Sequence, residues 1–193
     1  YILFYAEGVD NWSDENLTHN NLYASKSYYY VTVGGSNGKR ISIASSPSAG
    51  GSPTSISVFD DYQYHEIDLI NIARLGRKWF GEQFSVDDEQ SFEFNIPNIV
   101  ASSSIKLSVV SAAVAFTNTN LNVSANSNYV GSISYGASDP NGIHGIEGSL
   151  NTNIAASENV TINLKYNNNG VPSSNCYLDY IVLKSVRNLK GYG

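Results

Sequence analysis

The sequence predicts an all-β protein, an antiparallel β-sandwich of the jelly-roll type. Stretches in which apolar and polar residues alternate recur along the whole chain of 193 residues, between segments rich in Gly, Asn, Ser and Pro. Charged residues make up only 15% and Met is absent, whereas a coiled coil or helical bundle would need Ala, Glu, Lys, Leu and Arg at about half of its positions. The hydrophobic fraction of 41% is too high for intrinsic disorder.

Ten segments are predicted as strands, and each is bounded by residues that favour turns. Within 91–96, Phe92, Phe94 and Ile96 alternate with polar residues, which is typical of an antiparallel strand with one buried face. The segment 104–116 is apolar on both faces, so we expect a central strand that is covered on both sides. In chain order the predicted strands are 1–6, 28–33, 39–44, 56–69, 77–84, 91–96, 104–116, 128–135, 159–166 and 176–187.

The connections between the predicted strands carry turn chemistry. Gly, Asn and Asp adopt positive φ at low cost, and they are concentrated where hairpins and tight turns are expected. These turn segments are 34–38, 139–142 and 167–170. No helix of ordinary length is apparent, and 70–75 has room for a single helical turn.

A Ser-, Pro- and Gly-rich stretch over 44–55 is the longest segment of low complexity. Such a composition is typical of a loop between structured units. We therefore expect an N-terminal β unit over 1–55, belonging to a preceding domain or to the sandwich, and a sandwich domain over 56–193. Because the chain starts inside a predicted strand without Met and ends just after another apolar run, we expect it to be part of a longer polypeptide.

The charge of the chain argues against nucleic acid as a partner. Its formal net charge is -6, and the longest basic cluster, Arg74, Arg77 and Lys78, is too short to attract a phosphate backbone. No apolar run reaches the roughly 18 residues needed for a membrane-spanning helix. Cys176 is the single cysteine, so neither an internal disulfide nor a cysteine-based metal site is expected.

His144 and Cys176 are the residue types of a cysteine-peptidase dyad, and the segment 142–145 resembles the His-Gly of caspase-like peptidases. Such a dyad needs a parallel α/β sheet that presents both side chains at strand ends. Here His144 lies in a Gly-rich turn, and Cys176 alternates with Leu178 and Tyr180 as a packed strand residue. We therefore predict that Cys176 is buried, and that the chain holds no catalytic residue, metal site or cofactor.

Carboxylates form three groups that are close in sequence. Glu66 and Asp68 share a strand face at about 7 Å, and glycosidase pairs lie about 5–9 Å apart but come from different strands. The favoured interpretation is a solvated strand face, and Asp60 with Asp61 belongs to the same segment. The run 87–89 has the oxygen ligands of a calcium site, and a polar turn before a strand explains it equally well.

Three groups of aromatic side chains are candidates for a platform on which a sugar ring stacks. Tyr28 and Tyr30 alternate with Tyr29, so at least one of the two sets is expected in a core. The candidate platforms are Tyr28-Tyr29-Tyr30, Tyr62 with Tyr64, and Trp79-Phe80. Glycosylation sequons begin at Asn11, Asn16, Asn122 and Asn159, a number that chance explains in a chain this rich in Asn, Ser and Thr.

Trp79 and Asp179 carry two further structural predictions. Gly81, on the same face as Trp79, leaves room for close approach, so we expect Trp79 to be mostly buried. Asp179 lies in an apolar segment, with Tyr177, Ile181 and Leu183 expected on its face. A carboxylate there needs a partner, for which Arg77 is the candidate; the alternative is an exposed Asp179 on an edge strand.

Three groups of segments carry a resemblance to a known family. In this order they resemble the region that precedes the peptidase domain in gingipain-like cysteine peptidases of Bacteroidetes, especially the signal peptidase/sortase of the type IX secretion system. The middle group is the most specific. The first group comprises 1–8, Trp12, 21–30 and 38–41; the second, YHEID at 64–68 and GRKWFGEQF at 76–84; the third, LDYI at 178–181, Arg187 and Leu189.

The resemblance implies a β-rich, non-catalytic region whose catalytic His and Cys lie in a caspase-like domain C-terminal to it. His144 and Cys176 do not match the family's catalytic motifs, so no catalytic role is carried over. The full-length protein would be a secreted cysteine peptidase of the outer membrane and cell surface, removing C-terminal secretion signals and attaching cargo to surface polysaccharide. This chain would position the downstream peptidase domain or engage protein cargo; the alternative is a carbohydrate-binding module that holds surface polysaccharide.

Overall fold

The protein is described by a computed structural model over residues 5–6, 8–10, 20–21, 23–35, 42, 45, 55–72, 78–139 and 145–190. Contacts divide the chain into two compact units, 1–56 and 57–193, and each is described by itself. The described residues contain no helix, and so no helix among them that is long and apolar enough to cross a membrane.

The N-terminal unit has no strand among its described residues. The strand predicted over 28–33 is wrong, because this segment pairs with no strand and exposes large side chains on both faces, Tyr30 at 92% and Val31 at 73%. The β propensity of Tyr and Val reflects packing on a half-buried sheet and is not sufficient without one. Most of 1–6 and of 39–44 lies outside the described residues, so the β unit over 1–55 stays a prediction.

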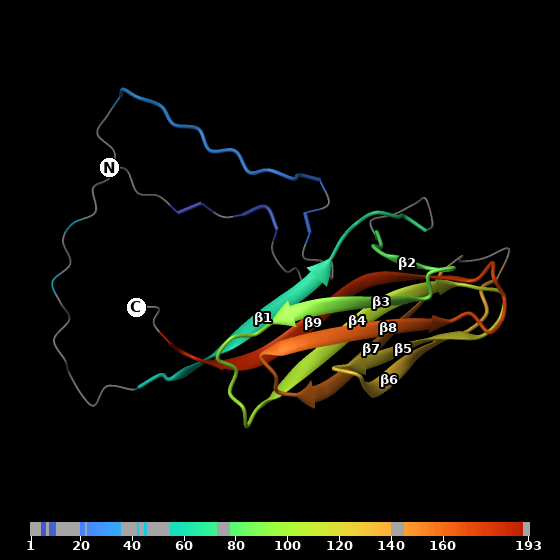
Figure 1. The fold of residues 1–193 in the computed structure, drawn as a ribbon. Coiled ribbons are helices and arrows are strands. Elements are labelled where there is room, and N and C mark those ends of the chain that lie inside the picture. The colour runs from blue at the N-terminus through green and yellow to red at the C-terminus, as the bar shows by residue number, and fades with distance from the viewer. Residues whose placement is uncertain are drawn as a thin grey trace. The chain divides into compact units, whose positions relative to one another are not determined.

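The second unit is an antiparallel β-sandwich, which confirms the predicted fold class (Figure 1). One sheet has the order β1-β9-β4-β7, with β2 also paired to β9, and the other has the order β3-β8-β5-β6. Apart from the β5–β6 hairpin, the connections from β2 to β9 pass between sheets, which gives the jelly-roll order. The strands are β1 (Val58–Glu66), β2 (Gln83–Phe84), β3 (Glu89–Asn95), β4 (Ser104–Val114), β5 (Thr119–Ala125), β6 (Asn128–Tyr135), β7 (Ile146–Ala155), β8 (Asn159–Asn167) and β9 (Asn175–Asn188).

Two of these strands, β5 and β7, were not predicted. The inward-facing side of β7 is only weakly apolar. Gly148 stands between Ile146 and Leu150, and Thr152 follows Leu150 on the same face. Gly148 is required there, because a Cβ would collide with the Ile133 side chain of the opposite sheet and lie 3.2 Å from the ring of Tyr135. β5 alternates correctly, but two of its outward positions, Asn120 and Asn122, are Asn, a residue type that is frequent in turns.

The core lies between the two sheets and is formed by inward-facing residues of β2 to β9. Its largest fully buried side chains include Tyr135, Tyr166, Phe84, Leu107 and Ile162. The strand predicted over 104–116 is central, as expected: β4 pairs with β9 on one side and β7 on the other. The expected cover of both of its faces is wrong, because Lys106 is exposed on the outer face of the sheet.

A β-bulge in β9 shifts the alternation of its side chains. Val110 pairs with Tyr180 whereas the next residue, Ser111, pairs with Leu178, so Asp179 is the extra residue of β9. Consequently Leu178 and Ile181, three residues apart, both join the core. The prediction that Ile181 and Leu183 share the face of Asp179 is therefore wrong.

Candidate functional site

The outer face of the five-stranded sheet is the candidate functional surface. Its antiparallel register aligns outward-facing residues from β1, β9, β4 and β7 in rows across the sheet. We call two adjacent rows the open face. The first row is Tyr62, Lys184, Lys106 and Asn153, and the second is Tyr64, Val182, Ser108 and Asn151.

Two tyrosines form the aromatic border of the open face. Tyr62 and Tyr64 project from the same side of β1, with ring centroids 6.2 Å apart and planes inclined at 41°. Tyr64 is 42% exposed, and the ammonium of Lys184 lies 5.6 Å from the centroid of the Tyr62 ring. Of the predicted aromatic platforms, this pair is the one that lies on a strand and faces solvent.

A hollow of about 360 Å³ opens beside this aromatic pair. Its size is at the lower end of ligand-binding pockets, which are about 300–1,000 Å³. Its wall combines an aromatic ring, two ammonium groups, a free carboxylate on Asp60 and hydroxyl groups. The lining residues are Asp60, Asp61, Tyr62, Ser104, Lys106, Lys184, Ser185 and Val186.

Farther along the same outer side, Lys78 from the connection between β1 and β2 lies against carboxylates of β7 and β9. We call this group the covered end; it consists of Glu66, Lys78, Glu147, Asp179 and Tyr180. Lys78 Nζ donates a hydrogen bond to Glu147 Oε2 at 2.8 Å and lies 3.0 Å from Asp179 Oδ2. The Asp179 side chain is only 3% exposed, so its predicted burial and pairing are confirmed. Lys78 is the observed partner, and Arg77 lies outside the described residues.

Burial raises the pKa of Asp179 to about 7, against the opposing attraction of Lys78; the nearby charges of Glu66 and Glu147 raise it further. Burial also opposes the charge of Lys78, but the hydrogen bond to Glu147 and the charge of Asp179 outweigh it and raise the pKa of Lys78. The two raised pKa values have different consequences for charge, because the ammonium of Lys78 is shared between the carboxylates of Glu147 and Asp179. The lysine stays charged, whereas Asp179 gains a proton near neutral pH.

Glu66 is 7% exposed, so its predicted position on a solvated strand face is wrong. It ends β1 and pairs with Tyr180, beside the extra residue Asp179. Asp68 lies beyond the end of β1 and is half-buried, so the two carboxylates do not form a pair on one strand.

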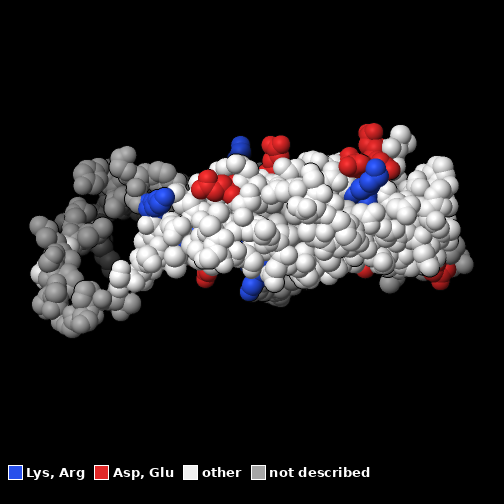
Figure 2. Space-filling view, turned by 60° about the horizontal axis from the view of Figure 1, so that its bottom comes forward, with Lys and Arg blue, Asp and Glu red and all other residues white. Residues whose placement is uncertain are grey.

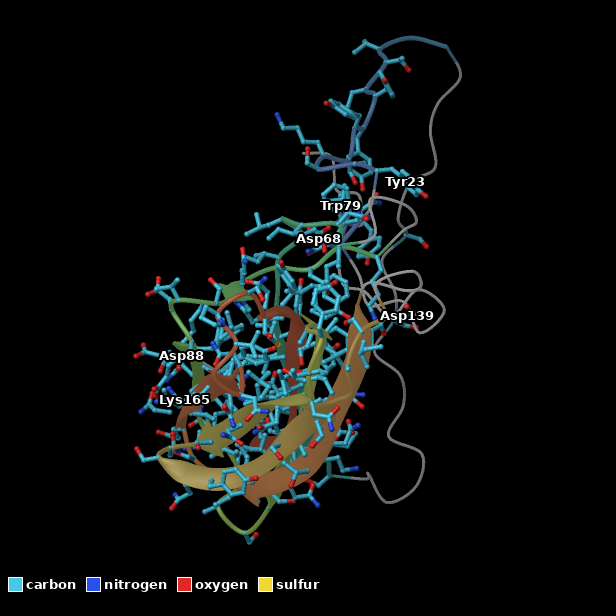
Figure 3. The ribbon with its side chains drawn as sticks, turned by 90° about the vertical axis from the view of Figure 1, so that its right-hand side faces the viewer. Tyr23, Asp68, Trp79, Asp88, Asp139 and Lys165 are labelled. Atoms are coloured by element: carbon cyan, nitrogen blue, oxygen red, sulfur yellow. The ribbon has the colours of Figure 1, made fainter. Side chains whose placement is uncertain are left out.

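Trp79 is 42% exposed, so its predicted burial is also wrong. The alternation along this segment is as expected, but the other face is the buried one, with Phe80 at 5% and Phe84 at 0% exposure. The close approach predicted at Gly81 does occur, since a Cβ there would lie 2.8 Å from the backbone oxygen of Ile67. Figure 3 shows Trp79 close to Asp68.

Cys176 is fully buried in the core, as predicted. Its thiol lies 3.6 Å from the hydroxyl of Tyr135, and burial raises the pKa of the thiol to about 12. The reactive thiolate is therefore suppressed at neutral pH. His144 lies outside the described residues.

Two further carboxylates, those of Asp61 and Glu89, make local ion pairs. Asp61 lies 3.2 Å from Arg187, and Glu89 lies 2.8 Å from Lys165, whose hydrogen bond lowers the pKa of Glu89. Asp88 lies near Lys165 at the same side of the sandwich (Figure 3). The described part of the chain contains no group of three or more side chains suited to hold a metal ion.

The outer face of the four-stranded sheet differs from the open face, because it is covered by short polar side chains. Asn163 donates to Ser91 and Asn120 donates to Asn122. The sequon residues Asn122 and Asn159 lie here, each accepting a hydrogen bond from another Asn; Asn11 and Asn16 lie outside the described residues.

The fold and the open face together define a jelly-roll β-sandwich domain that carries Tyr62 and Tyr64 on the outer face of its five-stranded sheet. No protein-family model matches the sequence, and no curated protein matches it. Among solved structures, dimeric latent PorU from Porphyromonas gingivalis is similar, with a TM-score of 0.60 and 19% identity over 72% of this chain and 14% of that chain. The likeness is one of fold, and this chain corresponds to a small part of the PorU chain.

Two carbohydrate-binding modules of the CBM36 type align less well. One is the CBM36-1 domain of a multidomain xylanase from the hindgut metagenome of Trinervitermes trinervoides, with a TM-score of 0.41 and 12% identity over 69% of this chain and 99% of that chain. The other, in complex with calcium and xylotriose, has a TM-score of 0.40 and 16% identity over 66% of this chain and 99% of that chain.

Proposed function

We propose that this chain is a non-catalytic accessory domain of a larger gingipain-like cysteine peptidase, of the signal peptidase/sortase type of the type IX secretion system. The observation that carries this proposal is the fold likeness to PorU, at a TM-score of 0.60 and over 14% of that chain. It agrees with the independent resemblance of three groups of sequence segments to that family. The domain would position the downstream peptidase domain or engage secreted cargo at the outer membrane and cell surface.

The chemistry of the core supports the non-catalytic part of this proposal. The single thiol, Cys176, is fully buried, and its raised pKa keeps it protonated at neutral pH. A nucleophilic cysteine needs a thiolate and an approach for substrate.

A cleavage assay tests this function. The isolated chain should not cleave peptides, whereas the complete polypeptide that contains it should. Replacing the domain in that polypeptide by an unrelated β-sandwich should then reduce cleavage of protein cargo. Unchanged cargo processing after this replacement, or peptide cleavage by the isolated chain that is lost in Cys176→Ala, would contradict the proposal.

A second candidate function is a carbohydrate-binding module. The observation that favours it is the pair of the half-buried Tyr62 and the exposed Tyr64 beside a hollow lined by polar groups. Ligand sites combine aromatic surface with a few well-placed hydrogen-bonding groups, as this one does. A glycan-binding assay with Tyr64→Ala tests it, and Trp79→Ala serves as a control with equal exposure at the covered end.

A further inference from the structure

The open face contains two lysines that lie directly opposite each other on neighbouring strands. Lys106 of β4 pairs with Lys184 of β9, and both side chains point away from the core into solvent. Like charges in directly opposite positions of an antiparallel pair destabilise the sheet. The sequence nevertheless places an ammonium group at both positions, in a chain that has only 11 Lys and Arg residues.

Neither lysine forms an ion pair with a carboxylate anywhere in the described part of the chain. Lys184 lies over the Tyr62 ring, and Asp60 lines the same hollow without coming within ion-pairing distance of either ammonium. The other lysine on this side of the sheet, Lys78, is held by two carboxylates. Charged groups are otherwise sparse, as the mostly uncharged surface in Figure 2 illustrates.

We propose that the open face binds an acidic saccharide, with a sugar ring against Tyr62 and Tyr64 and the sugar's carboxylate between Lys106 and Lys184. The inference deepens the carbohydrate-binding candidate above and rests on it. Charge complementarity identifies the acidic group, because a carboxylate between the two ammonium groups removes their repulsion. The apolar faces of the tyrosine rings and their hydroxyl groups match the two kinds of surface of a pyranose.

The other polar groups of the face select a saccharide over an acidic peptide. Ser108, Asn151 and Asn153 continue the two rows as neutral donors and acceptors, which suit sugar hydroxyls. Asp60, in the hollow, accepts hydrogen bonds from hydroxyls and repels further carboxylates. A ligand with one acidic group and several hydroxyls therefore fits this surface better than a run of Asp and Glu residues.

Isothermal titration of the complete chain tests the inference with three probes: trigalacturonic acid, its neutral methyl ester and a tetraglutamate peptide. The acid should bind, and its affinity should fall as salt rises from about 10 to about 150 mM, because both lysines are exposed. Lys106→Gln and Lys184→Gln should each weaken binding of the acid by about tenfold, the usual loss for a hydrogen bond to a charged group. Lys165→Gln, an exposed lysine of the other sheet, is the matched control and should leave the affinity within about twofold.

Each other outcome contradicts a defined part of the proposal. Equal binding of the acid and the ester, unaffected by the lysine variants, would overturn the acidic specificity and leave the carbohydrate-binding function. If neither saccharide binds, both the acidic specificity and the carbohydrate-binding function are overturned. Tetraglutamate binding as tightly as trigalacturonic acid would identify an acidic peptide site instead.

Discussion

The covered end and the open face belong to the same side of the same sheet, but their lysines differ in whether a carboxylate lies within ion-pairing distance. At the covered end a lysine lies within 3.0 Å of two carboxylates, and one of these, Asp179, is only 3% exposed. On the open face Lys106 and Lys184 lie directly opposite each other on neighbouring strands. The difference separates a charge network that stabilises the fold from two lysines that form no ion pair among the residues the structure describes.

The largest expected effect of a substitution is at the covered end. Lys78→Ala leaves Asp179 buried without its ammonium partner, and breaking a buried pair costs about 3–5 kcal/mol. Because Lys78 is 37% exposed and Asp179 can take up a proton, we expect a smaller loss, about 2 kcal/mol of the free energy of unfolding. Urea denaturation at neutral pH measures it. Lys184→Ala on the open face is the matched control, expected within about 0.5 kcal/mol of the wild type; an equal loss in both variants would remove the distinction.

The second prediction concerns pH. The pKa of Asp179 is about 7 in the folded state against 3.8 for an ordinary Asp, so the folded protein holds a proton that the unfolded chain releases between these values. The stability contributed by this carboxyl is fully present below about pH 4 and is lost as pH rises towards 7. Asp179→Asn should therefore gain stability relative to the wild type as pH rises from 4 to 7, by roughly 1 kcal/mol or more. Parallel stability curves for the two proteins over this range would show that Asp179 titrates normally.

The third prediction compares two aromatic side chains of equal exposure, Trp79 at the covered end and Tyr64 on the open face. Both are 42% exposed, so each substitution by Ala should cost about 1 kcal/mol rather than the 3–5 kcal/mol of a buried aromatic. Thermal unfolding measures the cost. Saccharide binding should be lost in Tyr64→Ala and kept in Trp79→Ala, and the reverse result would move the binding surface to the covered end.

The smallest expected effect is a gain. Lys106→Gln removes the repulsion across the β4–β9 pair and should raise stability by about 0.2–0.5 kcal/mol at low salt. The gain should disappear at about 1 M salt, where exposed charges are screened within about 3 Å. The melting temperature at the two salt concentrations measures it. A loss of stability at low salt would show that Lys106 already has a counter-charge.

Alternation alone was sufficient to predict the fold class, because most strands carry clear apolar faces. β3 and β8 were located to within two residues of their observed ends. β7 was missed because one of its inward-facing positions is Gly148. The missing side chain there makes room for the side chain of Ile133 from the opposite sheet. Such a position is recognisable only when the opposite sheet is in place.

The site was less predictable, because it depends on which residues of distant strands become neighbours. The sequence indicated Tyr62 with Tyr64, since both lie on one predicted strand, and it indicated that Asp179 needs a partner. It did not indicate the pairing of Lys106 with Lys184, which are 78 residues apart and meet through the register of β4 and β9. The bulge at Asp179 likewise changes which residues share its face, and alternation cannot anticipate an extra residue.

The last strand in sequence lies in the middle of its sheet. β9 is hydrogen-bonded to β1 and β2 on one side and to β4 on the other. More than a hundred residues separate β1 from β9, so β1 can pair only after all of these residues have been synthesised. The sandwich therefore cannot close progressively from its N-terminus, and its final assembly is delayed until β9 has emerged. Sheets built from such distant pairs fold slowly, so this chain should refold more slowly than a sandwich whose paired strands are consecutive in sequence.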